Sequence, residues 1–326
     1  MRIAFRSNQL CERGTEVAMY DYAVGNEELL GNESIIISQT NENPANLVAY
    51  QKFKDRFPTF LYENGNNEEM ERLLRENNVD AMYNICHGMP EDNLSKIVPN
   101  LIHCVFDCSY DKINKNTDRQ AAICSYLSNK YTNGAMPFVP HIIQKKVDTD
   151  SNLRDELGIP EDAIVIGRLG GQTTFNIQFV HDVIESIANE YDNIYWLFMN
   201  TLKFCNDQEN IIHLPMSLSD VEKAKFINTC DAMIHARREG EIFSVALGEF
   251  SIRNKPIFTF SDPLDTGHFD LFGDRIIEYS DSFSLYHLIT NFDFELSKKI
   301  DWDVYKDKYN DINVMNKFKE VFLDQW

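Results

Sequence analysis

The sequence is poor in positive charge. Its 326 residues include 31 lysines and arginines against 51 aspartates and glutamates, which gives a net charge of −20 at pH 7. Surfaces that bind nucleic acid or anionic lipid need clustered basic residues, so we expect neither partner. Hydrophobic residues make up 43% of the chain. That share allows a sizeable core and argues against a disordered protein.

Paired cysteines and long apolar runs are also missing. The seven cysteines are scattered singly, with no C-x-x-C spacing, so we predict reduced thiols and neither a disulfide framework nor a metal site. No apolar run approaches the ~18 residues of a membrane span, and residues 1–8 are too short and too polar for a signal peptide. We therefore expect a cytoplasmic protein without stable membrane insertion, including the case of a viral or phage product in its host's cytoplasm.

Short apolar runs alternate with helix-length segments along the whole chain. Runs typical of strands occur at residues 2–7, 34–38 and 80–85, and segments with helical periodicity separate them. The same alternation restarts after the polar stretch at 145–151. A regular strand–helix alternation predicts an α/β fold with parallel sheets that are covered by helices on both faces.

This restart predicts two domains. We place an N-terminal Rossmann-like domain at residues 1–144 and a C-terminal Rossmann-like domain at 145–302, with a cleft between them. A charged helix at 303–326 is expected to pack back on the first domain. Ligands of such sheets bind beyond the carboxyl ends of the strands, so we expect the functional residues in the loops that follow strands.

The most informative segment runs from Ala236 to Phe250 and reads A-R-R-E-G-E-I-F-S-V-A-L-G-E-F. Its carboxylates Glu241 and Glu249 have seven residues between them. We expect Glu241 at a loop-to-helix junction and Glu249 two turns into a helix whose other positions are apolar. A carboxylate on an apolar helix costs free energy unless a partner satisfies it. A polyhydroxylated ligand at the helix N-terminus would be such a partner.

The residues between the two glutamates add a second feature. Ile242, Phe243, Ser244 and Val245 would place backbone N–H groups at the start of this helix, where unpaired donors and the helix dipole attract a diphosphate. Ser244 is also a good N-cap residue, which is a purely structural role. The two roles can hold together.

The second half of the chain resembles the C-terminal domain of GT-B glycosyltransferases, most closely glycosyltransferase family 4. The resemblance covers roughly residues 150–290 and is looser in the first half, where Arg13-Gly14-Thr15-Glu16 is similar to the family's Gly-Gly-x-Glu loop. It rests on the order and spacing of four segments: Leu157 to Arg168, Asp231 to His235, Glu241 to Glu249, and Asn254 to Ile257.

The resemblance implies a role for each glutamate. Glu241 would bond the hydroxyls of the sugar in a nucleotide-sugar donor, and Glu249 would accept hydrogen bonds from the ribose hydroxyls. Carboxylates suit both tasks because two oxygens can hold two adjacent hydroxyls. The alternative for both residues is a solvated helix face.

Arg168 ends a strand, and the resemblance implies that it binds the donor diphosphate and stabilises the leaving group. The alternative is a salt bridge at the end of the strand. The family's usual partner is a lysine about six residues later, where this chain has Thr174. The threonine at this position leaves three alternatives open. Another cation compensates, for which Arg237 and Arg238 are candidates, or the donor is a different one, or the enzyme is weakened.

Four residues of the first half are further candidates. Gly14 and Thr15 would let the backbone approach the donor closely, although a plain tight turn explains them equally well. His87 follows a strand and could lie near the acceptor, but a lone histidine is more often a packed residue. Asp107 ends the next strand and could hold an acceptor hydroxyl.

The sequence therefore predicts a hexosyl- or related glycosyltransferase, of EC class 2.4. It would move a sugar from a nucleotide-diphosphate sugar to a hydroxyl of a glycan, lipid or small-molecule acceptor. The resemblance implies retention of configuration and no metal or other cofactor. Two alternatives remain open, a GT-B nucleotide-sugar epimerase and a catalytically silent sugar-nucleotide-binding protein. An NAD-dependent enzyme is disfavoured because no G-x-G-x-x-G follows the first strand.

Overall fold

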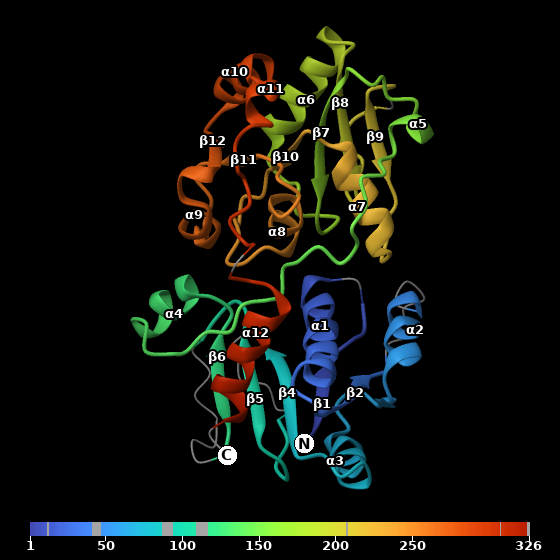
Figure 1. Cartoon of the computed structure of the whole chain (residues 1–326), viewed down its shortest axis with the longest axis vertical. Helices are drawn as coiled ribbons and strands as arrows, with labels where there is room; N and C mark the ends of the chain where they lie inside the picture. Colours follow the sequence, from blue (N-terminus) through green and yellow to red (C-terminus); the bar gives the residue numbers. More distant parts are fainter. Residues whose placement is uncertain are drawn as a thin grey trace. The chain divides into compact units, whose positions relative to one another are not determined.

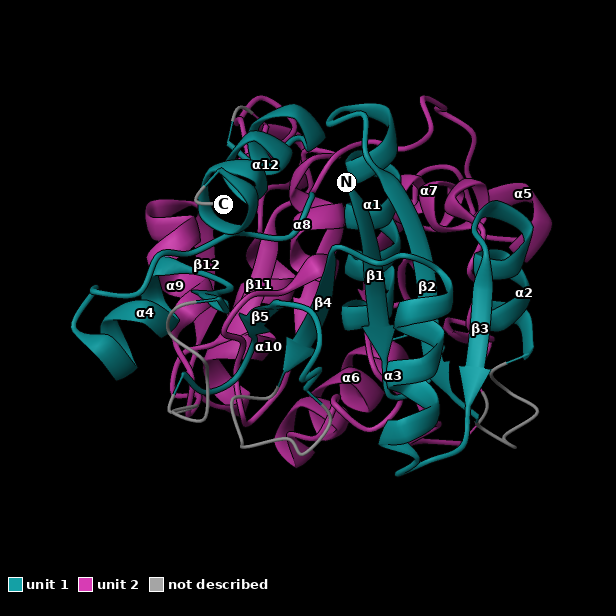
Figure 2. Cartoon of the chain, turned by 90° about the horizontal axis from the view of Figure 1, so that it is seen from below, with its two compact units in different colours: residues 1–142, 308–326 teal, residues 143–307 magenta. Residues whose placement is uncertain are grey.

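The chain folds into two compact units, which Figure 2 distinguishes by colour. The first consists of Met1–Ile142 and Lys308–Trp326, and the second of Ile143–Asp307. The computed structural model describes residues 1–11, 13–40, 47–86, 94–108, 117–206, 208–306 and 308–324. Each unit has a six-stranded parallel sheet with helices around it (Figure 1). The prediction of two Rossmann-like α/β units is therefore confirmed.

The first sheet has the strand order β3-β2-β1-β4-β5-β6, which is the order of dinucleotide-binding Rossmann folds. All of its strand pairs are parallel. The strands are short, and β1, β2, β4 and β5 are almost entirely buried, as central parallel strands under helices must be. Their bounds are β1 (Arg2–Ser7), β2 (Glu33–Gln39), β3 (Thr59–Tyr62), β4 (Ala81–Cys86), β5 (Asn100–Cys104) and β6 (Arg119–Ala122).

Alternating side chains of this sheet contact helices on opposite faces. Ile3 and Phe5 pack with α1 and α12 in one buried cluster, whereas Ala4 and Met82 pack with α3 in another. The C-terminal helix α12 lies against α1 (Figure 1), so the end of the chain completes the core of the unit that its start begins. The helices are α1 (Gly14–Glu28), α2 (Leu47–Arg56), α3 (Asn67–Glu76), α4 (Ser125–Thr132) and α12 (Asp311–Phe318), with a π-helical turn at Lys319–Leu323.

The second sheet has the order β12-β11-β10-β7-β8-β9. Read from β7 as its first strand, this is the same Rossmann order as in the first unit, and its strand pairs are also parallel. The strands are β7 (Ile164–Leu169), β8 (Ile194–Met199), β9 (Ile211–Leu214), β10 (Ala232–His235), β11 (Ile257–Phe260) and β12 (Ile276–Tyr279).

Helices also cover this second sheet. Trp196 and Phe258 pack with the apolar faces of α6 and α10, whereas Gly167 approaches Cys230 and Phe250 so closely that a Cβ there would collide with Cys230. The helices are α5 (Arg154–Leu157), α6 (Gln178–Glu190), α7 (Asp220–Thr229), α8 (Val245–Ser251), α9 (Gly267–Phe272), α10 (Ser282–Asn291) and α11 (Phe294–Ser297), with a 3₁₀ turn at Gly273–Arg275.

The expected C-terminal helix begins later than predicted, at Asp311 rather than near residue 303. Residues 302–306 instead form a loop that is held by hydrogen bonds and by a buried side chain. Trp302 is buried, and its backbone N–H donates to the side chain of Asn254. The Asp303 carboxylate accepts the backbone N–H groups of Tyr305 and Lys306. These side-chain bonds compete with helical ones and delay the start of the helix.

The seven cysteines are free thiols in the structure. Among the described residues, no helix has both the length and the apolar character needed to cross a bilayer.

Candidate functional site

The second sheet reverses its strand order between β7 and β10, and ligands of open α/β sheets bind beyond the strand ends at such a switch point. β7 ends in the Arg168–Leu169 pair, and the neighbouring β10 ends at His235. The loop after β10 carries Arg237 and Glu241. We call Arg168, His235, Arg237 and Glu241 the switch-point cluster.

Glu241 is the centre of this cluster. Its Oε2 lies 3.1 Å from Nη1 of Arg237, and its Oε1 lies 3.5 Å from Nε2 of His235. The side chain is only 17% exposed. Burial alone would raise the pKa of Glu241, but the contacts with His235 and Arg237 outweigh it, so the pKa lies below its usual value. Glu241 is therefore an ionised, fixed carboxylate at the switch point.

A second layer of polar groups fixes His235. Its Nδ1 lies 2.8 Å from Oγ1 of Thr259 on the neighbouring strand β11, and Nε2 of His268 lies 3.4 Å from the same oxygen. Nδ1 of His268 lies 3.2 Å from the backbone oxygen of Glu241. Burial lowers the pKa of His268 to about 4, which keeps this ring neutral. Sequence reasoning missed His235 as a site residue, although its place at the end of the Asp231–His235 strand was a usable signal.

Two glycines allow the backbone to pass close to Glu241. Gly240 has a φ of +69°, and a Cβ on it would collide with the backbone oxygen of Asp265. A Cβ on Gly267 would collide with the backbone oxygen of Ile242. The Glu241 N–H donates to Asp265 O at 3.2 Å. The loops after β10 and β11 are thus joined backbone to backbone, and only glycine fits at these contacts.

Arg168 has a different environment from the one expected. Its Nη1 donates to the backbone oxygen of Asn200 and to Oγ1 of Thr201, and its Nη2 donates to Gly171 O and to Oγ1 of Thr174. The residue is 4% exposed. Burial lowers its pKa to about 10, while Glu241 acts in the opposite direction. Arg168 ties together the loops that follow β7 and β8.

Ser244 is the N-cap of α8, and its Oγ accepts the backbone N–H of Leu247 at 3.3 Å. The backbone N–H groups of Ser244, Val245 and Ala246 have no acceptor in the part of the chain that the structure describes. Ile242 is buried, and the ring of Phe243 packs against Tyr305.

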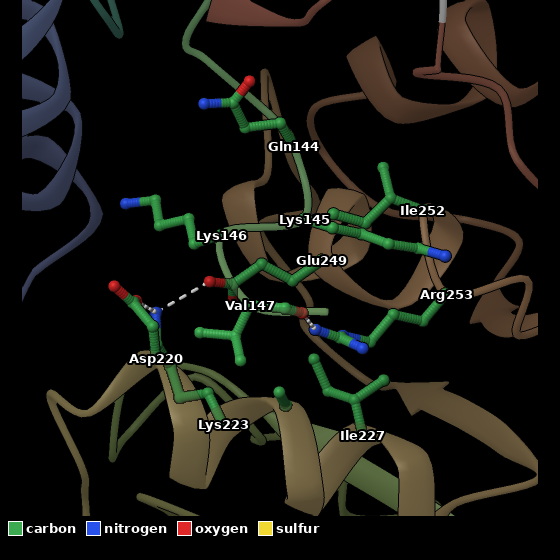
Figure 3. Close-up of a pocket in the computed structure, with 11 residues that line it drawn as sticks. Gln144, Lys145, Lys146, Val147, Asp220, Lys223, Ile227, Glu249, Ile252 and Arg253 are labelled. Carbon is green, nitrogen blue, oxygen red and sulfur yellow. Dashed lines mark hydrogen bonds and ion pairs between the residues drawn. The ribbon is translucent and has the colours of Figure 1, made fainter. Parts of the chain in front are cut away.

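Glu249 contacts Lys223 instead of the residues of the switch-point cluster. Its Oε1 accepts from Nζ of Lys223 at 2.8 Å, and that ammonium also lies 3.5 Å from a carboxylate oxygen of Asp220. Figure 3 shows Lys223 between the two carboxylates in a small pocket. Arg253 closes one side of this pocket by donating to the backbone oxygen of Val147. The pocket is lined by residues 144–147, α7 and α8.

The candidates of the first unit fall at the strand ends of its own sheet. Gly14 and Thr15 form the first turn of α1, after β1, and Oγ1 of Thr15 donates to Glu16 at 2.6 Å. Burial raises the pKa of Glu16. Asp107 is half-buried in the loop after β5. His87 lies outside the described residues.

No group of three or more His, Cys, Asp or Glu side chains could hold a metal ion among the residues that the structure describes.

Comparisons with known proteins give matches in structure but not in sequence. No family model and no curated protein matches the sequence. The structure is similar to a glycosyltransferase from Rickettsia africae, with a TM-score of 0.72 and 12% identity over 99% of both chains. It is similar to HepE from Anabaena in complex with UDP and glucose, with a TM-score of 0.71 and 13% identity over 98% of both chains.

A third similar structure is MnaA from S. aureus with UDP, which has a TM-score of 0.63 and 12% identity over 98% of this chain and 96% of that one. Identities this low establish the fold alone. The two six-stranded parallel sheets and their full-length match to these proteins confirm the predicted architecture. This chain has the GT-B fold.

Proposed function

We propose that the protein is a glycosyltransferase that moves a sugar from a nucleotide-diphosphate sugar to an acceptor hydroxyl. The observation that carries the proposal is the ionised Glu241, fixed between His235 and Arg237 at the switch point of the second sheet. A charged, positioned carboxylate at this edge suits a polyhydroxylated ligand. The UDP in the similar HepE and MnaA structures supports a nucleotide donor.

The contacts of the two glutamates are compatible with donor binding. A carboxylate has about four acceptor sites, and each oxygen of Glu241 has one partner, so both retain capacity for a sugar hydroxyl. Glu249 uses Oε1 for Lys223 and keeps Oε2 for a ribose hydroxyl. The diphosphate would bind at the amides of Ser244 and Val245.

The chemistry would be retaining, without a metal or cofactor. In this mechanism the leaving diphosphate takes the proton of the acceptor hydroxyl on the same face of the sugar. The protein contributes positioning and neutralisation of the leaving-group charge. We assign the acceptor, a glycan, lipid or small molecule, to the first unit, with Asp107 as a candidate residue, and we keep Gly14 and Thr15 as candidates for contact with the donor.

A donor panel tests the proposal. The full-length chain is incubated with UDP-, GDP- and ADP-sugars, and released nucleoside diphosphate is measured with and without candidate acceptors. We expect one donor to be hydrolysed slowly, and about 10²-fold more slowly by Glu241→Gln. The exposed Glu278 on β12 gives a matched control, since Glu278→Gln should act like the parent chain. If the parent chain neither binds nor turns over any donor, the proposal fails.

Two alternatives give different results in the same experiment. Two histidines beside Glu241 would suit proton transfer in a nucleotide-sugar epimerase, which would change the configuration of the sugar without an acceptor. Arg168 is already hydrogen-bonded to protein groups, which would suit a silent sugar-nucleotide-binding protein. That protein would bind UDP or another nucleotide without any turnover.

A further inference from the structure

Breaking the bond between a sugar and a diphosphate leaves extra negative charge on a phosphate oxygen, and a cation in contact with that oxygen lowers the barrier. The basic side chains that end or follow β7 and β10 are Arg168, Arg237 and Arg238. Position 174, where the family resemblance leads one to expect lysine, is a neutral threonine. The question is which of the three arginines serves the diphosphate.

The Nη atoms of Arg168 already donate hydrogen bonds to protein groups. These two atoms carry four hydrogens, and the structure gives them four acceptors within 3.1 Å, two on each nitrogen. A phosphate that bound to these Nη atoms would have to displace backbone carbonyls or threonine hydroxyls that hold neighbouring loops together. Arg168 therefore acts as a support for the site.

Arg237 has donors to spare. Its Nη1 contacts Glu241 at 3.1 Å, and its Nε lies 3.7 Å from a carboxylate oxygen of Glu239. That Nε is shielded from solvent and has no hydrogen-bond acceptor among the described residues. A guanidinium has five N–H donors in a planar fork that fits phosphate oxygens. The contact with Glu241 fixes one end of this fork and leaves most of its donors to a ligand.

Arg237 also lies within electrostatic range of the rest of the cluster. Its charge contributes to the lowered pKa of Arg168, for which burial is the main cause. An anion bound to Arg237 would therefore also relieve the repulsion between the two guanidinium groups. Arg238, one residue further on, is exposed, so solvent and salt screen its charge.

We propose that Arg237 is the side chain that binds the donor diphosphate, held for this task by Glu241, while Arg168 supports the neighbouring loops. The chain would then place its phosphate-binding cation after β10 instead of at position 174. This inference rests on the proposed function, because it concerns the same donor.

In the reaction, the bond between the anomeric carbon and the phosphate oxygen breaks, and its electron pair goes to that oxygen. The acceptor oxygen bonds to the anomeric carbon and gives up its proton, which the released phosphate oxygen takes. Arg237 donates hydrogen bonds to the diphosphate throughout and is not itself changed. One residue, Glu241, would thus link the sugar hydroxyls to the cation on the leaving group.

Calorimetric titration of the full-length chain with UDP and with uridine tests the proposal, with GDP and ADP and their nucleosides as the other probes. Arg237→Gln is compared with the parent chain and with Arg238→Gln, which removes the same charge one residue away. We expect Arg237→Gln to weaken UDP binding at least tenfold and to leave uridine binding unchanged. Arg238→Gln should stay within about twofold of the parent chain.

Three results separate the possible failures. If Arg237→Gln binds UDP as the parent chain does, the proposal is overturned. If it loses uridine as much as UDP, its role is structural and the proposal is again overturned. If the parent chain binds none of the three diphosphates, the proposed function fails instead. Arg237→Lys retains the ion pair with Glu241, and we expect it to fold and to bind UDP several-fold more weakly because the planar fork is lost.

Discussion

Nη2 of Arg168 donates a 2.6 Å hydrogen bond to Oγ1 of Thr174. Thr174 is the residue that stands where the family resemblance leads one to expect a lysine. A lysine there would bring a second cation against a buried guanidinium, whereas threonine supplies a neutral acceptor. Thr174 therefore holds Arg168, and under the proposed function the cation for the diphosphate would have to come from another position.

Thr174→Val tests this support role. The substitution keeps the shape of the side chain but leaves a buried charged donor without its acceptor, which costs about 1–3 kcal/mol of unfolding free energy. Urea unfolding measures the loss. Thr173 is exposed, so Thr173→Val should change stability by less than about 0.5 kcal/mol. Equal effects at the two positions would contradict the assignment.

Gly240→Ala should damage the loop that carries Glu241. The alanine meets two costs, the left-handed backbone and the collision of its Cβ with Asp265. Gly31 has nearly the same φ, +67°, but open space around a Cβ, so Gly31→Ala measures the backbone cost alone, about 1–2 kcal/mol. We expect Gly240→Ala to lower the unfolding free energy, measured with urea, clearly more than Gly31→Ala does. We also expect the Gly240→Ala protein that still folds to lose donor hydrolysis. If both variants lose the same unfolding free energy, the collision with Asp265 contributes nothing measurable and this prediction is wrong.

Lys223 and Glu249 should be energetically coupled. Their side chains are 13% and 20% exposed, so water screens this pair less than a surface pair. A double-mutant cycle with Lys223→Met and Glu249→Gln should give a coupling of about 1 kcal/mol. The more exposed pair of Lys225 and Glu222 should give about 0.3 kcal/mol. The prediction is wrong if the two double-mutant cycles give the same coupling energy.

Local sequence signals predicted the fold and the backbone of the site. Alternating apolar runs located most of the strands, because parallel strands under helices need no polar residues. Ser244 caps α8 and Gly158 ends α5 in a left-handed conformation with a φ of +68°, as their residue types indicate. The strands β6 and β12 and the helix α10 went unrecognised. β6, with the sequence R-Q-A-A, has neither β-branched residues nor an apolar run.

Side-chain partners could not be predicted in the same way. Arg168 meets Thr201, and Lys223 meets Glu249. In both pairs, partners more than 20 residues apart come together only because the fold places their segments side by side: the end of β7 and the loop after β8 for Arg168 and Thr201, and the helices α7 and α8 for Lys223 and Glu249. No periodicity in the sequence indicates such a contact, so these two bonds could not be predicted.

The buried histidines of the first unit predict a loss of stability in acid. His103 donates from Nε2 to Val139 O at 2.7 Å, and its Nδ1 faces the hydroxyl of Tyr83 at 2.7 Å. Since a carbonyl can only accept, Nε2 carries a proton, and the low pKa of the ring keeps it neutral at pH 7. Burial lowers the pKa of His103 to about 4 and that of His141 well below its usual value. The unfolded chain takes up these protons below about pH 6.5, so acid favours unfolding.

The unfolding free energy should therefore be constant above about pH 6.5 and fall as the pH drops toward about 4, with His103 contributing up to about 3 kcal/mol. Urea unfolding at a series of pH values measures the slope. His103→Gln, which can still donate to Val139, should be less stable at neutral pH but show a shallower acid slope, because one titrating group is gone. His287 is exposed, so His287→Gln should keep the full slope. An unchanged slope in His103→Gln would show that other groups set the acid limit.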